Sequence, residues 1–472
     1  MRGGYAGEGS VRDVKAHTTS ISMSSTSSNY AVIVAGEAVV DGFTVNGGSG
    51  CFRCESGSPV ISNNVMWGGE HTSSCGVEVL DGSPLISGNL FMNTAPAVHV
   101  RDGAPVIQRN RIVNRGGMGV VCTDATAWID RNAFYECNGA VWCEDSVDVR
   151  ITNNKFVANR DVVGCIHSSA EIVNNTIAWN RGNGIYCFHA SVVVANNIIA
   201  FNTGTGVFVD NFASALLVNN DVYGNNRNYR GTNPGPSDIQ ADPQFAGPEF
   251  GDVHIRPTSP CRDTGATDTA GIPDYDLEGR PRPYGPAPDI GAMEWSGEDY
   301  PDPYQPGVIY VDASAAPGGD GTTWETAYRS IQVAAEDVVW NCGAEIWVAQ
   351  GEYPEFVTLA RYTRLYGGFA SGDAKEDRDP EAKVATINPP SGLAIWAGHR
   401  VVVDGLTVRA SWSGIDCGGG SSTISNNVVI IDGHKIYTCY GIHSEGGSPI
   451  ITRNLILGTP PYGPSTYLPK SA

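Results

Sequence analysis

The sequence lacks several features that would place it in common classes of protein. It has no run of about 18 apolar residues, so no segment is predicted to cross a membrane as a helix. Its first residues, MRGGYAGEGS, lack the apolar core of a secretion signal. Charged residues make up only 17% of the chain and the net charge is −20, which argues against nucleic-acid or anionic-membrane partners. Neutral glycans or cations remain as candidate partners.

What the chain has in abundance is repetition. An asparagine closes an alternating apolar stretch every 21 to 25 residues, at Asn64, Asn89, Asn110, Asn132, Asn154, Asn175, Asn197 and Asn220. A period in this range predicts a solenoid, whose coils bury their apolar faces only by stacking on their neighbours. Asparagine tolerates a left-handed backbone, and its amide can bond to the coils above and below. We therefore expect an asparagine ladder at one corner of the solenoid.

Each coil divides into three short strands. The first has the form Gly-apolar-x-apolar, and the second ends at the asparagine ladder. The third ends in a second asparagine row at Asn114, Asn159, Asn180, Asn202 and Asn225. Abundant turn residues, 58 Gly and 28 Pro, fit this layout. The predicted fold class is all-β, a right-handed parallel β-helix with three strands per coil of about 22 residues.

The twelve cysteines are predicted to be mostly free, buried thiols and not a disulfide framework. Five share one apolar slot of the repeat, where other coils have valine: Cys54, Cys122, Cys143, Cys187 and Cys417. Cys51 and Cys165 are assigned to a slot two residues earlier. Stacked in this way, they would serve as small core hydrophobes. Metal binding by this row is not expected, because no cysteine pair comes with a matching His or Cys pair.

The repeats are expected to fill residues 1–228. Residues 229–295 have no period, are rich in Pro, Gly and Asp, and are expected to cap the last coil. A proline-rich linker, 296–307, then leads to a second β-helix unit, 308–472. In that unit the stretch Ser330–Trp340 has the apolar spacing of a short capping helix.

An internal duplication relates the two units, because Val401–Asn427 matches Ala38–Asn64 without a gap. The first unit is expected to begin partway into a module whose beginning the second displays, and the second to break off after roughly two asparagine-ladder coils. We therefore expect a slice of a longer tandem array, with a secretion signal and an anchor elsewhere. Open β-edges at Met1 and near Thr459 would favour head-to-tail self-association.

Two sets of motifs resemble known families. The coils resemble the pectate-lyase-like right-handed parallel β-helix superfamily. The segments DPQF, GDVHIRPTSPCRDTGA, DLEGRPRP and DIGAMEW resemble the terminal part of choice-of-anchor Q domain-containing bacterial proteins, and YVDASAAPGGDGTTWETAYRSIQ resembles their beginning. The resemblance implies a secreted or cell-surface bacterial protein, in families mostly without an assigned reaction. It also implies a polysaccharide groove on the outward face of the first strands.

Alternation along the first strands predicts which side chains face outward. One outward column is Arg53, Glu78, His99, Val121, Trp142, Ile166, Tyr186 and Phe208. The second, two residues on, is Glu55, Leu80, Arg101, Thr123, Glu144, Ser168, Phe188 and Asp210. The end with Trp142, Tyr186, Phe188, Phe208 and Asp210 is predicted to bind glycan, with aromatic rings stacking on sugars. The alternative is ordinary aromatic stacking that shields the sheet.

Glu78, His99, Arg101 and Glu144 are the candidates for acid–base chemistry on this face. A polysaccharide lyase needs a base and a cation, whereas a glycoside hydrolase needs two carboxyls about 5–10 Å apart. Residues in one slot of adjacent coils lie about 4.8 Å apart, so Glu78 and Arg101 are expected near His99. The motifs of pectate lyases, polygalacturonases and alginate epimerases are not found in the sequence.

A row of aspartates follows the first strands, at Asp81, Asp102, Asp124 and Asp145. Stacked carboxylates repel unless they are neutralised, so this row is a candidate site for a cation such as Ca²⁺. The alternative is that each carboxylate accepts hydrogen bonds from its own turn. No other metal or cofactor is predicted.

The sequence therefore favours a secreted or cell-surface β-helix protein that binds a polysaccharide or cell-surface glycan, or acts as an adhesin. The alternative is a polysaccharide lyase or glycoside hydrolase working in the first-strand groove around His99 and Glu144. Whether a reaction is catalysed is left open by the sequence.

Overall fold

The computed structural model shows two compact units. The described residues are 1–3, 19–23, 29–68, 74–268, 271–297, 306–338, 344–390, 392–418, 420–432, 439–445 and 447–458. One unit comprises Met1–Pro248 with Asp252–Gln305, and the other comprises Glu249–Gly251 with Pro306–Ala472. Most of the expected linker and the expected edge near Thr459 lie outside the described residues. No described helix is long and apolar enough to cross a membrane.

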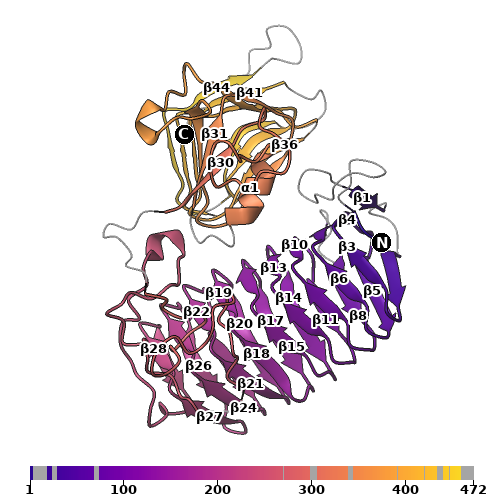
Figure 1. The fold of residues 1–472 in the computed structure, drawn as a ribbon, viewed down its shortest axis with the longest axis vertical. Coiled ribbons are helices and arrows are strands. Elements are labelled where there is room, and N and C mark those ends of the chain that lie inside the picture. The colour runs from indigo at the N-terminus through magenta and orange to yellow at the C-terminus, as the bar shows by residue number, and fades with distance from the viewer. Residues whose placement is uncertain are drawn as a thin grey trace. The chain divides into compact units, whose positions relative to one another are not determined.

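The first unit is a solenoid of three sheets, in which strands adjacent in a sheet come from successive coils and run parallel (Figure 1). The first-strand sheet consists of β2 (Tyr30–Ala35), β5 (Gly50–Ser56), β8 (Cys75–Val79), β11 (Val98–Val100), β14 (Met118–Thr123), β17 (Gly139–Glu144), β20 (Asp161–Ile166), β23 (Ile185–Phe188), β26 (Thr205–Val209) and β29 (Arg227–Arg230). The second-strand sheet consists of β3 (Val39–Asp41), β6 (Val60–Ser62), β9 (Leu85–Ser87), β12 (Val106–Gln108), β15 (Trp128–Asp130), β18 (Val149–Thr152), β21 (Ser169–Val173), β24 (Ser191–Ala195) and β27 (Ser214–Val218). The third-strand sheet consists of β1 (Thr19–Ser22), β4 (Phe43–Asn46), β7 (Val65–Trp67), β10 (Leu90–Met92), β13 (Arg111–Val113), β16 (Ala133–Tyr135), β19 (Lys155–Val157), β22 (Thr176–Ala178), β25 (Ile198–Ala200) and β28 (Asp221–Tyr223).

The core of this unit is a set of apolar columns inside the three sheets. One inward-facing residue of each second strand stacks on the residue at the same register position of the next coil. This column contains Ile61, Ile86, Ile107, Ile129, Ile151 and Ile172, all fully buried. Burying each such side chain contributes about 1.5–3 kcal/mol. The predicted right-handed parallel β-helix is confirmed.

The asparagine ladder is confirmed as a continuous chain of buried hydrogen bonds. The backbone N–H and side-chain Nδ2 of Asn132 donate to Asn154 Oδ1 at 2.9 and 3.0 Å. Asn154 Nδ2 in turn donates to the carbonyl oxygen of Ile129 at 2.8 Å and to Asn175 Oδ1 at 3.0 Å. Each amide therefore satisfies groups on two neighbouring coils that water cannot reach.

The left-handed backbone predicted for the ladder asparagines was assigned to the wrong residue. It belongs to the residue before each of them, with φ of +53° at Arg131, +51° at Asn153 and +53° at Asn174. The chain turns at this corner residue, and the next residue places its amide inside the stack. Several corner residues are also asparagine, which explains the repeated Asn-Asn pairs of the sequence.

The corner asparagines bind the segment that follows the coils. Asn153 Nδ2 donates to the carbonyl oxygen of Tyr275 at 2.8 Å, and Asn219 Nδ2 donates to that of Thr264 at 2.8 Å. At the end of the solenoid, Asp238 Oδ1 accepts the backbone N–H and Nδ2 of Asn220 at 2.8 and 3.0 Å. A carboxylate thus occupies the next ladder position and satisfies donors that the last coil would leave open.

The cysteines of the first unit follow the predicted pattern with two corrections. The slot two residues before Cys54 holds Phe52, which pairs with Val77, so the assignment of Cys51 to that slot was wrong. Cys122, Cys143, Cys165 and Cys187 form one vertical column inside the first-strand sheet. Cys165 therefore occupies the same slot as its neighbours, and its assignment to a slot two residues earlier was wrong. All eleven cysteines among the described residues are free thiols, and ten of them are buried. Burial raises the pKa of the Cys187 thiol well above its usual range.

We expect the column thiols to resist a charged thiol reagent in the native protein. The thiolate is the reacting species, and these thiols are both buried and protonated at neutral pH. Modification of Cys143 and Cys187, followed by mass spectrometry of peptides, is expected to be roughly tenfold or more slower in buffer than in denaturant. Partly exposed Cys439 serves as the internal comparison. Equal rates for the three residues in buffer would contradict a closed column.

The second unit is a shorter solenoid of the same kind. Its first sheet consists of β30 (Val308–Val311), β31 (Glu345–Ala349), β34 (Arg364–Phe369), β37 (Val402–Asp404), β40 (Thr423–Ser425) and β43 (Ile450–Thr452). Its second consists of β32 (Gly351–Tyr353), β35 (Ala385–Ile387), β38 (Thr407–Ala410), β41 (Val428–Ile431) and β44 (Leu455–Gly458). Its third consists of β33 (Val357–Leu359), β36 (Leu393–Ala397), β39 (Ser413–Asp416) and β42 (Tyr440–His443). The predicted helix is present as α1 (Ile331–Val338), with its apolar face, including Ile331 and Val338, buried.

Candidate functional site

The first-strand sheet presents the outward column that the sequence singled out, with one difference. Register places Trp142 beside Gly164, and Gly164 beside Tyr186. Ile166 lies instead in the second column, next to Glu144 and Phe188, and Ser168 is buried in the following turn. The predicted places of Ile166 and Ser168 were therefore wrong. The core decides the register, because Val163 and Cys165 face inward in this coil.

This shift creates an aromatic cluster, which we define as Trp142, Tyr186, Phe188 and Phe208. A Cβ on Gly164 would lie 2.3 Å from Trp142 Cε3, so only glycine leaves room for the indole at this height. The Trp142 and Tyr186 rings are stacked with centroids 6.4 Å apart and an angle of 20°. The ring centroids of Tyr186 and Phe208 lie 5.2 Å apart. All four side chains are half-buried, so the cluster has an open face.

Polar groups border the aromatic cluster. The Arg230 guanidinium lies 4.4 Å from the centre of the Phe208 ring. Asp210 Oδ1 accepts the backbone N–H of His189 at 3.1 Å, and its Oδ2 lies 3.5 Å from His189 Nδ1. The predicted sugar-binding residues therefore lie along one stretch of neighbouring coils: Trp142, Tyr186, Phe188 and Phe208 on strands β17 to β26 of one sheet, and Asp210 directly after β26.

Three of the four acid–base candidates are brought together. Glu78 lies between two arginines, with Oε1 2.7 Å from Arg101 Nε and Oε2 3.6 Å from Arg53 Nε. Burial opposes ionisation of Glu78, but the hydrogen bond from Arg101 and the nearby positive charges hold its pKa below the usual value. Burial and then the charge of Arg101 lower the pKa of His99. At neutral pH the site therefore holds a carboxylate in ion pairs and a neutral imidazole.

Glu144 lies apart from that group. Its strand β17 is separated from β11, which carries His99, by β14, a rise of about 10 Å at two coils. Its carboxylate is exposed and follows Trp142 on the same strand. Glu144 therefore belongs with the aromatic cluster by position.

Two carboxylates of the aspartate row accept hydrogen bonds from the backbone of their own turns, which is the alternative to a calcium site. Asp81 Oδ1 accepts the N–H of Gly82 at 2.6 Å, and Asp102 Oδ1 accepts that of Gly103 at 2.7 Å. Asp124 and Asp145 sit at left-handed turn positions, with φ of +53° and +50°. Within the described ranges, no group of three or more His, Cys, Asp or Glu side chains is arranged to hold a metal ion. A calcium site at this row stays a prediction.

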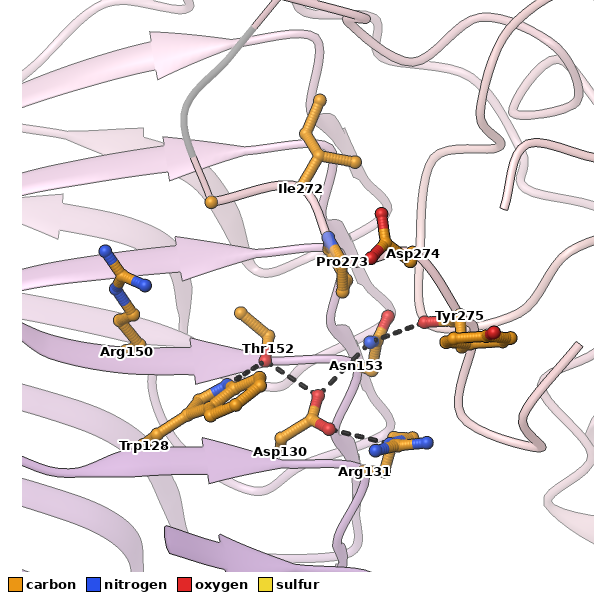
Figure 2. A pocket seen from close by; sticks show the side chains of 11 residues that line it. Trp128, Asp130, Arg131, Arg150, Thr152, Asn153, Ile272, Pro273, Asp274 and Tyr275 are labelled. Carbon is orange, nitrogen blue, oxygen red and sulfur yellow. Dashed lines mark hydrogen bonds and ion pairs between the residues drawn. The ribbon is translucent and has the colours of Figure 1, made fainter. Parts of the chain in front are cut away.

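A pocket on the second-strand sheet was not predicted from the sequence (Figure 2). It lies between strands β15 and β18 and the segment Gly271–Tyr275, and it encloses about 390 Å³. A signal was present, because Trp128 stands in a slot that holds Leu85 and Val106 in the preceding coils. The other wall, Gly271–Tyr275, could not be predicted from the repeat, because it comes from the aperiodic segment.

Two family models match the chain. A model described as right handed beta helix region matches residues 101–235, and one described as periplasmic copper-binding protein (NosD) matches residues 9–165. This is a right-handed parallel β-helix protein. A search of curated proteins finds no match to this β-helix protein. The comparisons do not show the resemblance to choice-of-anchor Q proteins.

Two solved structures are similar to this β-helix protein. The pectate lyase Pel9A is 12% identical, with a TM-score of 0.31, over 54% of this chain and 88% of its own. A mutant of the PL6 family alginate lyase AlyGC is 11% identical, with a TM-score of 0.23, over 90% of this chain and 75% of its own. At this level of similarity neither structure bears on function.

Proposed function

We propose that this β-helix protein binds carbohydrate on the outward face of its first-strand sheet, through the aromatic cluster. The observation that carries the proposal is the Trp142 indole, which packs over Gly164 and stacks with Tyr186 while one side of the cluster stays open. Flat aromatic surfaces bind the apolar faces of sugar rings, and a rigid sheet holds them in place at little entropic cost.

The surroundings of the cluster support a polar, extended ligand. Glu144, Asp210 and Arg230 border the rings and offer hydrogen-bond acceptors and donors for hydroxyl groups. Strands β17 to β26 repeat at about 4.8 Å, so the cluster forms a linear track and not a closed hole. We further propose that the protein works outside the cytoplasm, where such glycans are met, as an adhesin or a binding module.

Catalysis around His99 is the second candidate. Its neutral imidazole is able to accept a proton at neutral pH. Arg101 follows His99 by two residues and lies beside Glu78. Arg101 is already in an ion pair with Glu78, however, and Glu144 lies two coils away from His99. The arrangement therefore favours binding over a paired acid and base.

The proposal is tested by measuring the binding of a panel of neutral and uronate-containing polysaccharides, by affinity electrophoresis and calorimetry. Trp142→Ala is expected to weaken binding roughly tenfold, and Gly164→Val should act in the same direction by displacing the indole. Trp412→Ala, an exposed tryptophan of the second unit, is the matched control. Binding by Trp142→Ala equal to the wild type would overturn the proposal, and new unsaturated or reducing ends would establish catalysis in its place.

A further inference from the structure

The pocket on the second-strand sheet is partly open to solvent and separate from the aromatic cluster. One wall is the outer face of β15 and β18, and the other is the segment Gly271–Tyr275 (Figure 2). Its volume of about 390 Å³ falls within the roughly 300–1,000 Å³ of small-molecule sites. The first-strand face takes no part in it, so the two surfaces can be tested apart.

An anchored indole forms the floor of this pocket. Trp128 Nε1 donates to Thr152 Oγ1 at 2.9 Å, which fixes the ring against the sheet. The side chain is nevertheless 41% exposed, although the pocket lies over it. An indole whose polar end is satisfied and whose face is open is suited to stack on a flat, partly apolar ring.

Hydrogen bonds centred on Asp130 and Asn153 fix the side chains at one end of the pocket (Figure 2). Asp130 Oδ1 accepts from Thr152 Oγ1 at 2.8 Å and Asn153 Nδ2 at 3.2 Å, and Oδ2 accepts from Arg131 Nε at 2.6 Å. Asn153 also donates to the carbonyl oxygen of Tyr275 at 2.8 Å. Both walls are therefore tied together before any ligand arrives, which lowers the entropic cost of binding.

Both arginines of the pocket are already paired with carboxylates. Arg131 forms an ion pair with Asp130, and Arg150 lies 3.2 Å from the Glu171 carboxylate at the rim. Asp274 adds a further carboxylate to the lining. A uronate or phosphate would meet no surplus of positive charge, whereas hydroxyl groups can both donate to carboxylates and accept from guanidinium groups.

We propose that this pocket binds a neutral pyranose unit, with the sugar ring stacked on Trp128 and its hydroxyl groups bonded to Arg150 and Asp274. Pro273 and Ile272 then cover the ring from the side of the aperiodic segment. The site is a second point of attachment for a neutral glycan, independent of the first-strand face.

Calorimetric titration of the full chain tests this site, with cellobiose, mannobiose, xylobiose and diacetylchitobiose as neutral probes and digalacturonate as the charged probe. We expect at least one neutral disaccharide to bind and digalacturonate not to bind at this site. Trp128→Ala should weaken neutral binding roughly tenfold, and the control Trp412→Ala, at an exposed tryptophan of the second unit, should leave it unchanged. Circular dichroism checks the fold of each variant.

Arg150→Ala tests the pocket independently, in case Trp128→Ala fails to fold. Arg150→Ala removes a largely exposed side chain, so it should fold normally and still weaken the neutral sugar several-fold. Neutral binding that survives both Trp128→Ala and Arg150→Ala but is lost in Trp142→Ala would overturn the pocket proposal and leave the first-strand proposal standing. Failure of every neutral disaccharide to bind the wild type, or binding of digalacturonate that is lost in Trp128→Ala, would also overturn the pocket proposal.

Discussion

Asn154→Ala is expected to lower the free energy of unfolding of the first solenoid by roughly 4 kcal/mol or more. The substitution removes hydrogen bonds to four groups: Asn132 N, Asn132 Nδ2, the carbonyl oxygen of Ile129 and Asn175 Oδ1. All of these lie inside the corner. Loss of the acceptor for the buried Asn132 N–H costs about 1–3 kcal/mol, and each of the other lost hydrogen bonds contributes about 0.5–1.5 kcal/mol, because Asn132 Nδ2 and Asn175 Oδ1 keep other partners. Urea denaturation followed by circular dichroism measures the change.

Asn211→Ala is the matched control for that substitution. Asn211 is an exposed asparagine in the turn after β26, and its replacement is expected to change the free energy by less than about 0.5 kcal/mol. Equal denaturation midpoints for the two variants would show that the ladder amides contribute no more than surface asparagines. Because a solenoid divides into coupled coils, the unfolding slope should be compared as well as the midpoint.

Arg282→Ala is expected to destabilise the first unit by about 3–5 kcal/mol. The side chains of Arg282 and Glu294 are both 0% exposed, and Arg282 Nη1 lies 2.8 Å from Glu294 Oε1. Nη1 also donates to the carbonyl oxygen of Asp289 at 2.9 Å, and Nη2 donates to that of Gly291 at 3.2 Å. Removal of the guanidinium leaves a buried carboxylate without its partner, which is the costly case.

A double-mutant cycle isolates that ion pair. Arg282→Ala with Glu294→Ala should be less destabilised than the sum of the two single variants, because neither charge then remains buried alone. Arg160→Ala, at an exposed arginine, is the control and should be near neutral. Thermal unfolding measures all four, and simple additivity of the two single changes would contradict the coupling.

The Arg282 pair also gives a structural reason for the sequence motifs of the aperiodic segment. Arg282 lies in DLEGRPRP, and Asp289 and Glu294 lie in DIGAMEW. These side chains fold the segment upon itself, and Asn153 and Asn174 tie it to the solenoid. The motifs thus position the wall that carries Ile272, Pro273 and Asp274 and need no catalytic role to explain them.

The period of the sequence predicted most of the fold, but it misplaced residues where a local pattern was ambiguous. Matching glycine to glycine shifted the coil of Cys165 by two residues, because Gly164 was read as the start of a strand. The structure uses Gly164 as an outward position under Trp142. Only the packing of Val163 and Cys165 against neighbouring coils decides between these registers.

The sequence by itself determined that the chain forms stacked three-strand coils, since buried alternation and recurring amides admit no other way of covering the apolar faces. Tertiary structure alone decided where the two proposed ligand sites lie. The aromatic cluster depends on the height of Gly164 beside Trp142, and the pocket joins Trp128 to residues 271–275, far along the chain. The contacts that form the pocket cannot be predicted from the sequence repeat, because one wall belongs to a segment that does not repeat.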